Sequence, residues 1–340
     1  MKVTRDQKQH LFEKGYLILK NVVPREQVDA ARAAFNEEIG RLRIRAAFGK
    51  PSPEVQEAAR RTFGASNPVF LELFNQSPAK QIVSSLIEGG IDDATGVQNA
   101  FNYPMTPDDS VNETGYRDRD TPFYGWGGHL DGCWSGGGPP PPIGKAMTPA
   151  QKKKWWQHTA RNTCDLDYPG YNATILNFTA LVGIALSDQR RTGVGNLGVL
   201  AGAHHAIEQV FREQAEAGGP IGPDGPGWDR LNKNAPNGHG LNHYPDSIRE
   251  QFRRGAVVTD DGRIWPKPTL LKLAPGDMVI AHFALPHSAT RVHGPDPRMM
   301  CYYRITPKTR PGESRAPYVP ALTDIWHEWR GMKQFRRSRP

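Results

Sequence analysis

Apolar residues in the first quarter of the chain recur with the period of a helix. Over 24–48 they begin with Val28, Ala31 and Phe35, three or four residues apart, which predicts one buried stripe on a long helix. Residues 4–7, "TRDQ", have the form of a capping box and predict a shorter helix from about Asp6 to Lys14 that ends at Gly15. The apolar run "YLILKNVV" then predicts a strand, and we expect further helices to about residue 89.

From about Val97 onward the pattern changes to short apolar runs separated by Gly and Pro, which is typical of strands. Strands are predicted over 173–186, 197–202, 269–274, 278–285 and 299–306. The segment "APGD" at 274–277 predicts a turn that joins two of these strands into a hairpin. No helices alternate regularly with the strands, so an antiparallel barrel or jelly roll is favoured over a doubly wound sheet.

We therefore expect a mainly β protein with flanking helices, organised as one domain over 1–340. It divides into a helical part (1–96), a jelly-roll core (97–310), and a C-terminal helix with a basic tail (311–340). Two long insertions interrupt the core at about 132–171 and 215–262, and the first is predicted to hold a helix near 149–160. Segments of this length are usually lids, binding loops or disordered.

Composition restricts the cellular setting. Of 340 residues, 37% are hydrophobic, yet no apolar run is long enough to cross a membrane and the N-terminus lacks the apolar core of a signal peptide. The three cysteines, Cys133, Cys164 and Cys301, include no close pair, which excludes a disulfide framework and a cysteine zinc site. We expect a soluble, cytoplasmic protein, and the sequence does not indicate its oligomeric state.

The formal net charge of +8 is spread along the chain, except for the cluster "RGMKQFRRSRP" at 330–340. We interpret this cluster as a solvated tail, with nucleic-acid binding as the less favoured alternative. An anionic small-molecule substrate is a simpler use of the surplus positive charge.

The segment "GWGGHLDGCW" at 125–134 carries the first candidate chemistry. Residues two apart on an extended strand point to the same side, so His129 and Asp131 can direct an imidazole nitrogen and a carboxylate oxygen at one point. Two histidines and one carboxylate form the facial site of non-haem iron(II) oxygenases, which leaves three coordination positions open. The second histidine can come from His282 in an apolar run, His287 at the end of the strand after the hairpin, or His293 in a loop.

Arg298 stands eleven residues beyond His287, at the start of another predicted strand. A guanidinium binds a carboxylate through two parallel hydrogen bonds, which suits a cosubstrate that chelates iron at one end and is anchored at the other. H-x-D alone is weak evidence for such a site. The evidence becomes strong when H-x-D is followed in order by "GVGNLGVLAGAHH", "PGD", His287 and Arg298.

In this order the chain resembles the phytanoyl-CoA dioxygenase family of iron(II)- and 2-oxoglutarate-dependent oxygenases. The resemblance covers most of the chain, from "EKGYLILKNVVPREQV" through "ALSDQRRTGVGNLGVLAGAHH" to the segment 276–298. It implies a double-stranded β-helix, a cupin-like jelly roll, with helices packed outside. It also implies that Fe(II) is held by His129, Asp131 and His287, and that Arg298 anchors the far carboxylate of 2-oxoglutarate.

The chain departs from the family pattern in two places. Ala201 and Ala203 stand where the family usually has Pro and Ser, and "SAT" rather than a glycine-rich run follows His287, although Ser288 is retained here as a cosubstrate contact. The implied reaction uses 2-oxoglutarate and O2, releases succinate and CO2, and hydroxylates a small molecule. Relatives that halogenate have a small residue in place of Asp131, so the resemblance favours hydroxylation, or another oxidation such as desaturation or ring formation.

Two other hypotheses stay open at this point. The chain is alternatively a jelly-roll protein that binds a metal without turnover, or an oxygenase that acts on nucleic acid through its basic C-terminus. Nothing resembles a CoA-binding motif, so the family's name does not predict the substrate. We interpret His282 as a buried structural histidine, His243 as a loop residue, and Arg304 either as a contact for an acidic substrate or as an ordinary ion-pair residue.

Overall fold

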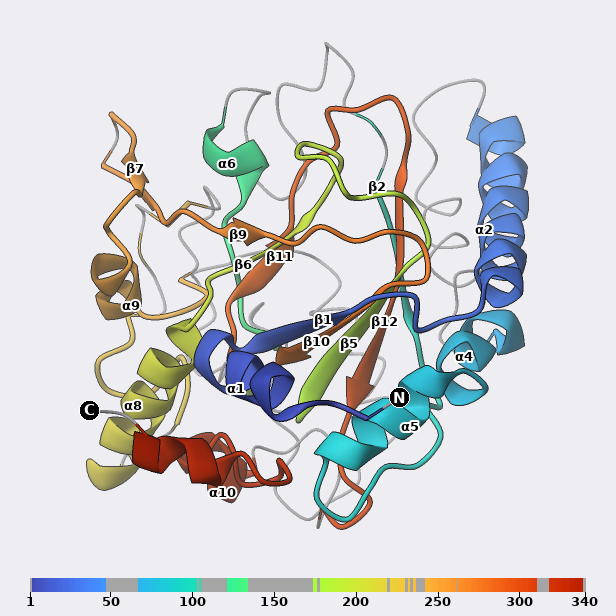
Figure 1. The fold of residues 1–340 in the computed structure, drawn as a ribbon. Helices are drawn as coiled ribbons and strands as arrows, with labels where there is room; N and C mark the ends of the chain where they lie inside the picture. Colours follow the sequence, from blue (N-terminus) through green and yellow to red (C-terminus); the bar gives the residue numbers. More distant parts are fainter. Residues whose placement is uncertain are drawn as a thin grey trace, which may run out of the picture.

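The computed structural model describes residues 2–46, 67–102, 104, 121–133, 174–175, 178–218, 221–229, 232, 235–236, 242–260, 262–310 and 318–338. Its largest sheet has five antiparallel strands in the order β1-β10-β5-β12-β2 (Figure 1). Their bounds are β1 Tyr16–Leu19, β2 Gln98–Asn102, β5 Ala180–Ala185, β10 Met278–His282 and β12 Arg298–Ile305. The antiparallel, sheet-rich architecture with flanking helices agrees with the predicted class.

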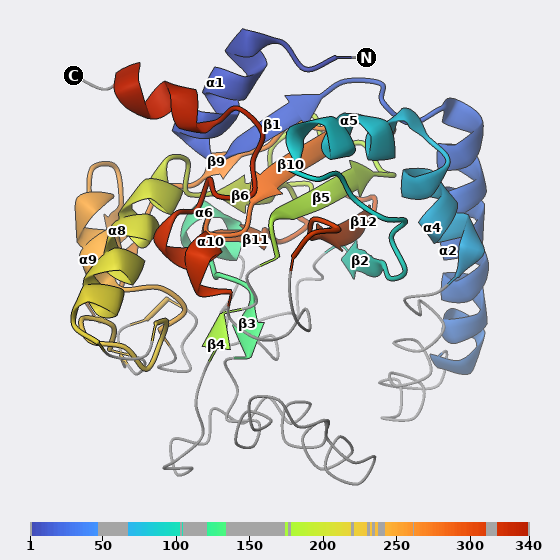
Figure 2. The same cartoon turned by 90° about the horizontal axis from the view of Figure 1, so that it is seen from below.

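A second sheet of three antiparallel strands lies beside the first, in the order β11-β6-β9 (Figures 1 and 2). Its strands are β6 Leu197–Val199, β9 Thr269–Leu270 and β11 His287–Ala289. Two short ribbons complete the described strands, β3 Gly132–Cys133 with β4 Thr174–Ile175, and β7 Val257–Val258 with β8 Ile264–Trp265. The strand predicted over 173–186 is thus divided between β4 and β5.

The hairpin predicted around 274–277 is wrong, although its turn is present. The amide of Asp277 donates to the carbonyl of Ala274, and the Asp277 carboxylate accepts from the Ala274 amide, while Gly276 takes φ = +88°. The strands on either side do not pair with each other, because β9 pairs with β6 and β10 pairs with β5 and β1. The turn therefore carries the chain from one sheet to the other.

The N-terminal elements follow their sequence signals closely. Helix α1 (Arg5–Lys14) has the predicted capping box between Thr4 and Gln7, and it ends at Gly15 with φ = +79°. Strand β1 then pairs with β10 at the edge of the large sheet. Helix α2 (Arg25–Ala46) buries Val28, Ala31 and Phe35, as the stripe predicts.

Two short helices, α4 (Pro68–Asn75) and α5 (Pro78–Leu86), begin at the side-chain caps Asn67 and Ser77. Helix α4 packs on β12, because the Phe74 ring stacks on Tyr303 and the Tyr303 hydroxyl donates to the carbonyl of Phe70. Alternate residues of a strand point to opposite sides. Arg298, Met300, Tyr302 and Arg304 therefore face away from α4; the first three are buried, and Arg304 is exposed.

The remaining helical elements are α6 Pro122–Gly125, α8 Ala203–Glu216, α9 Asp246–Gln251, α10 Val319–Thr323 and the 3-10 helix η1 Lys333–Ser338. The end of α8, α9 and β7 lie inside the predicted second insertion, whereas the helix predicted near 149–160 lies outside the described residues. None of the described helices is long and apolar enough to span a membrane.

The basic C-terminal segment differs from the predicted solvated tail. Lys333 forms an ion pair with Asp324, and Arg336 forms ion pairs with both Asp324 and Glu208. The ring of Phe335 also packs against Phe12 of α1. These basic side chains hold the C-terminal segment on α8 and α1, so their charge is partly neutralised within the fold.

Candidate metal centre

The structure brings His129, Asp131 and His287 together between the two sheets. His129 and His287 lie directly opposite each other and exchange both backbone N–H···O bonds, of 3.0 and 2.9 Å. Their ring centroids are 4.8 Å apart. One ligand atom from each of the three side chains lies within 4.8 Å of the other two, which is a spacing that one ion can bridge.

Of the three candidate second histidines, His287 is the one that lies beside His129 and Asp131, and the other two lie elsewhere. His282 is fully buried, and its Nε2 lies 2.8 Å from the carbonyl of Ile325 while its Nδ1 accepts from the Ala284 amide. His293 packs edge-on against the Tyr124 ring. One expectation about His287 was wrong, because β10 ends at His282 and His287 opens the separate strand β11.

One of the two ring nitrogens of His287 is available as a ligand atom. Its Nδ1 lies 2.9 Å from the carbonyl oxygen of Leu285, which can only accept, so the proton sits on Nδ1 and the Nε2 lone pair is left free. Burial lowers the pKa of His287 to about 4. The ring is thus neutral near pH 7, as a ligand must be.

The two carboxylate oxygens of Asp131 have different partners. Oδ1 lies 3.6 Å from Nε2 of His129, whereas Oδ2 accepts a hydrogen bond of 2.9 Å from Nε of Arg304. Burial raises the pKa of Asp131, but the hydrogen bond with His129, the charge of Arg304 and, when the rings are protonated, the charges of His287 and His129 outweigh that effect and hold the pKa well below its usual range. The carboxylate is therefore ionised, with Oδ1 nearest to His129 and Oδ2 bonded to Arg304.

Arg298 is a buried cation on the interior side of β12, with only 1% of its surface exposed. Nη1 donates to Oδ1 of Asn102 at 2.9 Å, and Nη2 contacts the hydroxyl of Tyr302 and the sulfur of Met300. Within the described part of the chain, its Nε has no hydrogen-bond partner and the guanidinium forms no ion pair with a carboxylate. A buried charge in this state is costly unless an anion joins it.

Tyr302 interacts electrostatically with Arg298 and with Asp131, one of the three candidate ligands. Burial raises the pKa of Tyr302, the charge of Arg298 lowers it, and the charge of Asp131 raises it. The Tyr302 ring is therefore within electrostatic range of both Arg298 and Asp131. This alignment on one side of β12 was not predicted, although the spacing of two between Arg298, Met300, Tyr302 and Arg304 could have indicated it.

Ser288, the other predicted cosubstrate contact, follows His287 on β11 and so points to the other side of that strand. It lies opposite Gly198, and the indole of Trp126 covers Gly198. This orientation argues against a contact between Ser288 and a ligand on the side of His287.

The second insertion contributes a histidine that the sequence did not place near the site. The His243 ring lies 6.2 Å from the His129 ring, centroid to centroid, in an edge-on arrangement. Its neighbours Asn242 and Tyr244 are fully buried and both bond to the guanidinium of Arg249, which is itself 3% exposed. Arg249 therefore fixes this segment beside the candidate ligands.

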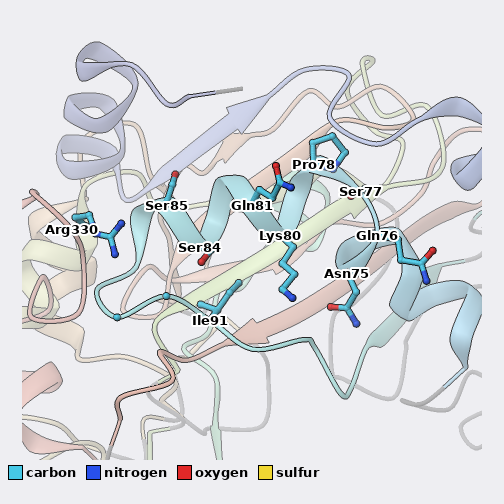
Figure 3. Close-up of a pocket in the computed structure, with 12 residues that line it drawn as sticks. Asn75, Gln76, Ser77, Pro78, Lys80, Gln81, Ser84, Ser85, Ile91 and Arg330 are labelled. Carbon is cyan, nitrogen blue, oxygen red and sulfur yellow. The ribbon is translucent and has the colours of Figure 1, made fainter.

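A separate hollow of about 970 Å³ is lined largely by residues of α5 (Figure 3), and none of the three candidate ligands lines it. The described residues that line it include no histidine, cysteine or carboxylate. Its two cations are already paired, Lys80 with Asp93 and Arg330 with Glu88. It therefore offers no imidazole, thiolate or carboxylate to bind a metal.

The chain matches no protein-family model and no curated protein. Among solved structures it is similar to HygX from Streptomyces hygroscopicus with nickel, 2-oxoglutarate and hygromycin B bound, at 13% identity over 90% of this chain and 88% of that chain, with a TM-score of 0.42. It is also similar to the non-heme alpha ketoglutarate dependent carbocyclase SnoK from nogalamycin biosynthesis, at 11% identity over 89% and 84% of the chains, with a TM-score of 0.38. Because these values are low, the phytanoyl-CoA dioxygenase resemblance stays a prediction, and we infer the function from the side chains of this chain.

Proposed function

We propose that the protein is an iron(II)- and 2-oxoglutarate-dependent oxygenase that hydroxylates, or otherwise oxidises, a small molecule. The observation that carries this proposal is the buried Arg298, which forms no ion pair with a described carboxylate and sits on the same side of β12 as Arg304, the partner of Asp131. A metal site alone needs no such arginine. A dicarboxylate that chelates the metal at one end needs a cation to bind its other end.

The donor set fits iron(II). Two imidazole nitrogens and one carboxylate oxygen converge, and this set leaves three positions for other ligands. When bound, iron(II) with 2-oxoglutarate and O2 supplies the oxidising chemistry that transfers an oxygen atom to the substrate, with succinate and CO2 as the other products. We also propose that the two sheets are the halves of a double-stranded β-helix.

The side chains of the chain then have distinct roles. His129, Asp131 and His287 hold the metal, with His287 kept in one tautomer by Leu285. Arg298 binds the far carboxylate of the cosubstrate with its guanidinium oriented by Asn102 and the Tyr302 hydroxyl. Burial of Arg298 keeps water away from the far end of the cosubstrate.

The first test is an anaerobic titration of the metal-free protein with iron(II) and then 2-oxoglutarate, followed through the visible charge-transfer absorption of the chelate. The parent should develop this band, and His129→Ala should not. The matched control His327→Ala replaces an exposed histidine and should behave as the parent.

Two outcomes would contradict the proposal in different ways. Tight iron binding without a band would favour the alternative, a jelly-roll protein that binds metal without turnover. Absence of iron binding in the parent would remove the metal centre itself. Succinate formation that needs both iron and His129 would confirm turnover once a substrate is found.

A further inference from the structure

Arg304 donates a hydrogen bond to one of the two carboxylate oxygens of Asp131. Its Nε donates to Oδ2 at 2.9 Å, while Oδ1 remains on the side of His129 Nε2 at 3.6 Å. The Asp131 side chain is 11% exposed, so few water molecules can compete for Oδ2. The carboxylate is thus held in one orientation before any metal arrives.

The arginine itself is held in place. Arg304 lies near the end of β12, opposite Leu181 of β5, so its backbone is paired within the large sheet. The guanidinium carbon lies 5.7 Å from the centroid of the Phe178 ring, which provides a cation–π contact. A rigid strand and an aromatic ring therefore fix the donor that orients Asp131.

We propose that Arg304 is a positioning residue that makes Asp131 a ligand through one oxygen only. This inference rests on the proposed metal centre. A carboxylate can bind a metal through one oxygen or both, and binding through both would fill one of the three positions that the facial arrangement leaves open. A chelating cosubstrate needs two of those positions and O2 needs the third. The hydrogen bond to Oδ2 would disfavour binding through both oxygens and so keep all three positions available.

Removing the Arg304 side chain should have two opposite effects on metal affinity, so the sign of the measured change shows which effect is larger. Loss of a positive charge beside the site would strengthen the binding of a divalent cation. Loss of the partner that orients a ligand typically weakens metal binding by about 10–100-fold. If Arg304 acts by positioning, the second effect is the larger.

The test uses cobalt(II) alone, titrated into the metal-free protein and followed by its visible absorption. Arg304→Met should weaken cobalt(II) binding by about 10–100-fold and change the shape of the spectrum. In Arg304→Gln, the amide nitrogen occupies the same place along the side chain as the arginine Nε but carries no charge, so we expect most of the affinity to return. Arg304→Lys keeps the charge one atom further out and should restore less. Arg253→Met, at an exposed arginine, is the matched control.

A double-mutant cycle isolates the interaction with Asp131. In an Asp131→Ala background, Arg304→Met should no longer weaken cobalt(II) binding and should strengthen it slightly, because only the loss of the positive charge remains. Unchanged or increased affinity in Arg304→Met alone, with the thermal stability of the parent, would overturn the proposal, as would full recovery by Arg304→Lys without recovery by Arg304→Gln. Because no cosubstrate is present, a parent that binds cobalt(II) but ignores 2-oxoglutarate would refute the proposed function and leave this inference standing.

Discussion

Replacing Arg298 with methionine should abolish the response to a dicarboxylate while leaving the ligand-free fold intact. The guanidinium is 1% exposed, and the amide of Asn102, the hydroxyl of Tyr302 and the sulfur of Met300 are its only hydrogen-bond partners among the described residues. Replacing buried charges by apolar side chains of similar size is often neutral or stabilising. We expect the free energy of unfolding of the ligand-free variant to stay within about 1.5 kcal/mol of the parent's, because lost hydrogen bonds offset the released desolvation cost.

The effect on ligand binding should be much larger. Hydrogen bonds to charged groups contribute about 1.5–3 kcal/mol each, and the guanidinium can make two, so the Kd should rise by about 100-fold or more. At a 2-oxoglutarate concentration of about 100 times the parent's Kd, binding stabilises the parent by about 2.7 kcal/mol and the variant by about 0.4 kcal/mol. With an unfolding entropy of about 2.1 cal/mol/K per residue, the Tm should rise by about 4 °C in the parent and by less than about 1 °C in the variant.

The assay is thermal unfolding of the manganese(II)-loaded protein without O2. It compares 2-oxoglutarate with 2-oxopentanoate, which has the same chain length and chelating end but lacks the far carboxylate. The parent should respond strongly only to 2-oxoglutarate, and Arg298→Met should respond weakly and equally to both. Arg298→Lys keeps the positive charge but cannot donate two parallel hydrogen bonds, so its discrimination between the two acids should be intermediate. A variant that still discriminated between the two acids would refute the reasoning.

Two further predictions concern the framework around the site. Gly198→Ala should destabilise the protein by about 1–3 kcal/mol in urea unfolding, because the new Cβ would lie 2.4 Å from Cδ1 of Trp126. Gly294→Ala is the milder control, because among the described residues its Cβ would meet only Val194, at 3.2 Å. Equal losses of stability in the two variants would contradict the steric argument. Burial lowers the pKa of His282 to about 3, below its unfolded value of 6.5, so the unfolded chain gains a proton first and stability falls as the pH drops from 6.5 toward 3. Between pH 7 and 5, His282 should lower the free energy of unfolding by about 2 kcal/mol. His282→Gln should remove this contribution when stability is measured by denaturant unfolding at both pH values. The same loss of stability between pH 7 and 5 in parent and variant would contradict the prediction.

Elements set by local chemistry could be predicted from the sequence. The capping box at Thr4, the helix end at Gly15 and the buried stripe begun by Val28 depend on neighbours within a few residues. The convergence of His129 and Asp131 likewise follows from the alternation of side chains on an extended segment.

Features that depend on pairing between distant segments could not be predicted. The turn at 274–277 was recognised, but a turn does not determine whether its two strands pair with each other or with strands of different sheets. Arg304 was left between two interpretations because its partner Asp131 lies on a segment far away in the sequence. For the same reason nothing near His243 indicated that it would meet His129.

Because Arg249 anchors residues 242–244, the segment that carries His243 can change in evolution independently of the core that carries His129 and His287. The backbone bridge between His129 and His287 belongs to the core, whereas His243 reaches the same place from the segment between α8 and α9. Substitutions or length changes in that segment can alter what approaches His129 without disturbing the bridge. Substrate preference can therefore diverge among descendants of this chain while the three converging side chains are inherited unchanged.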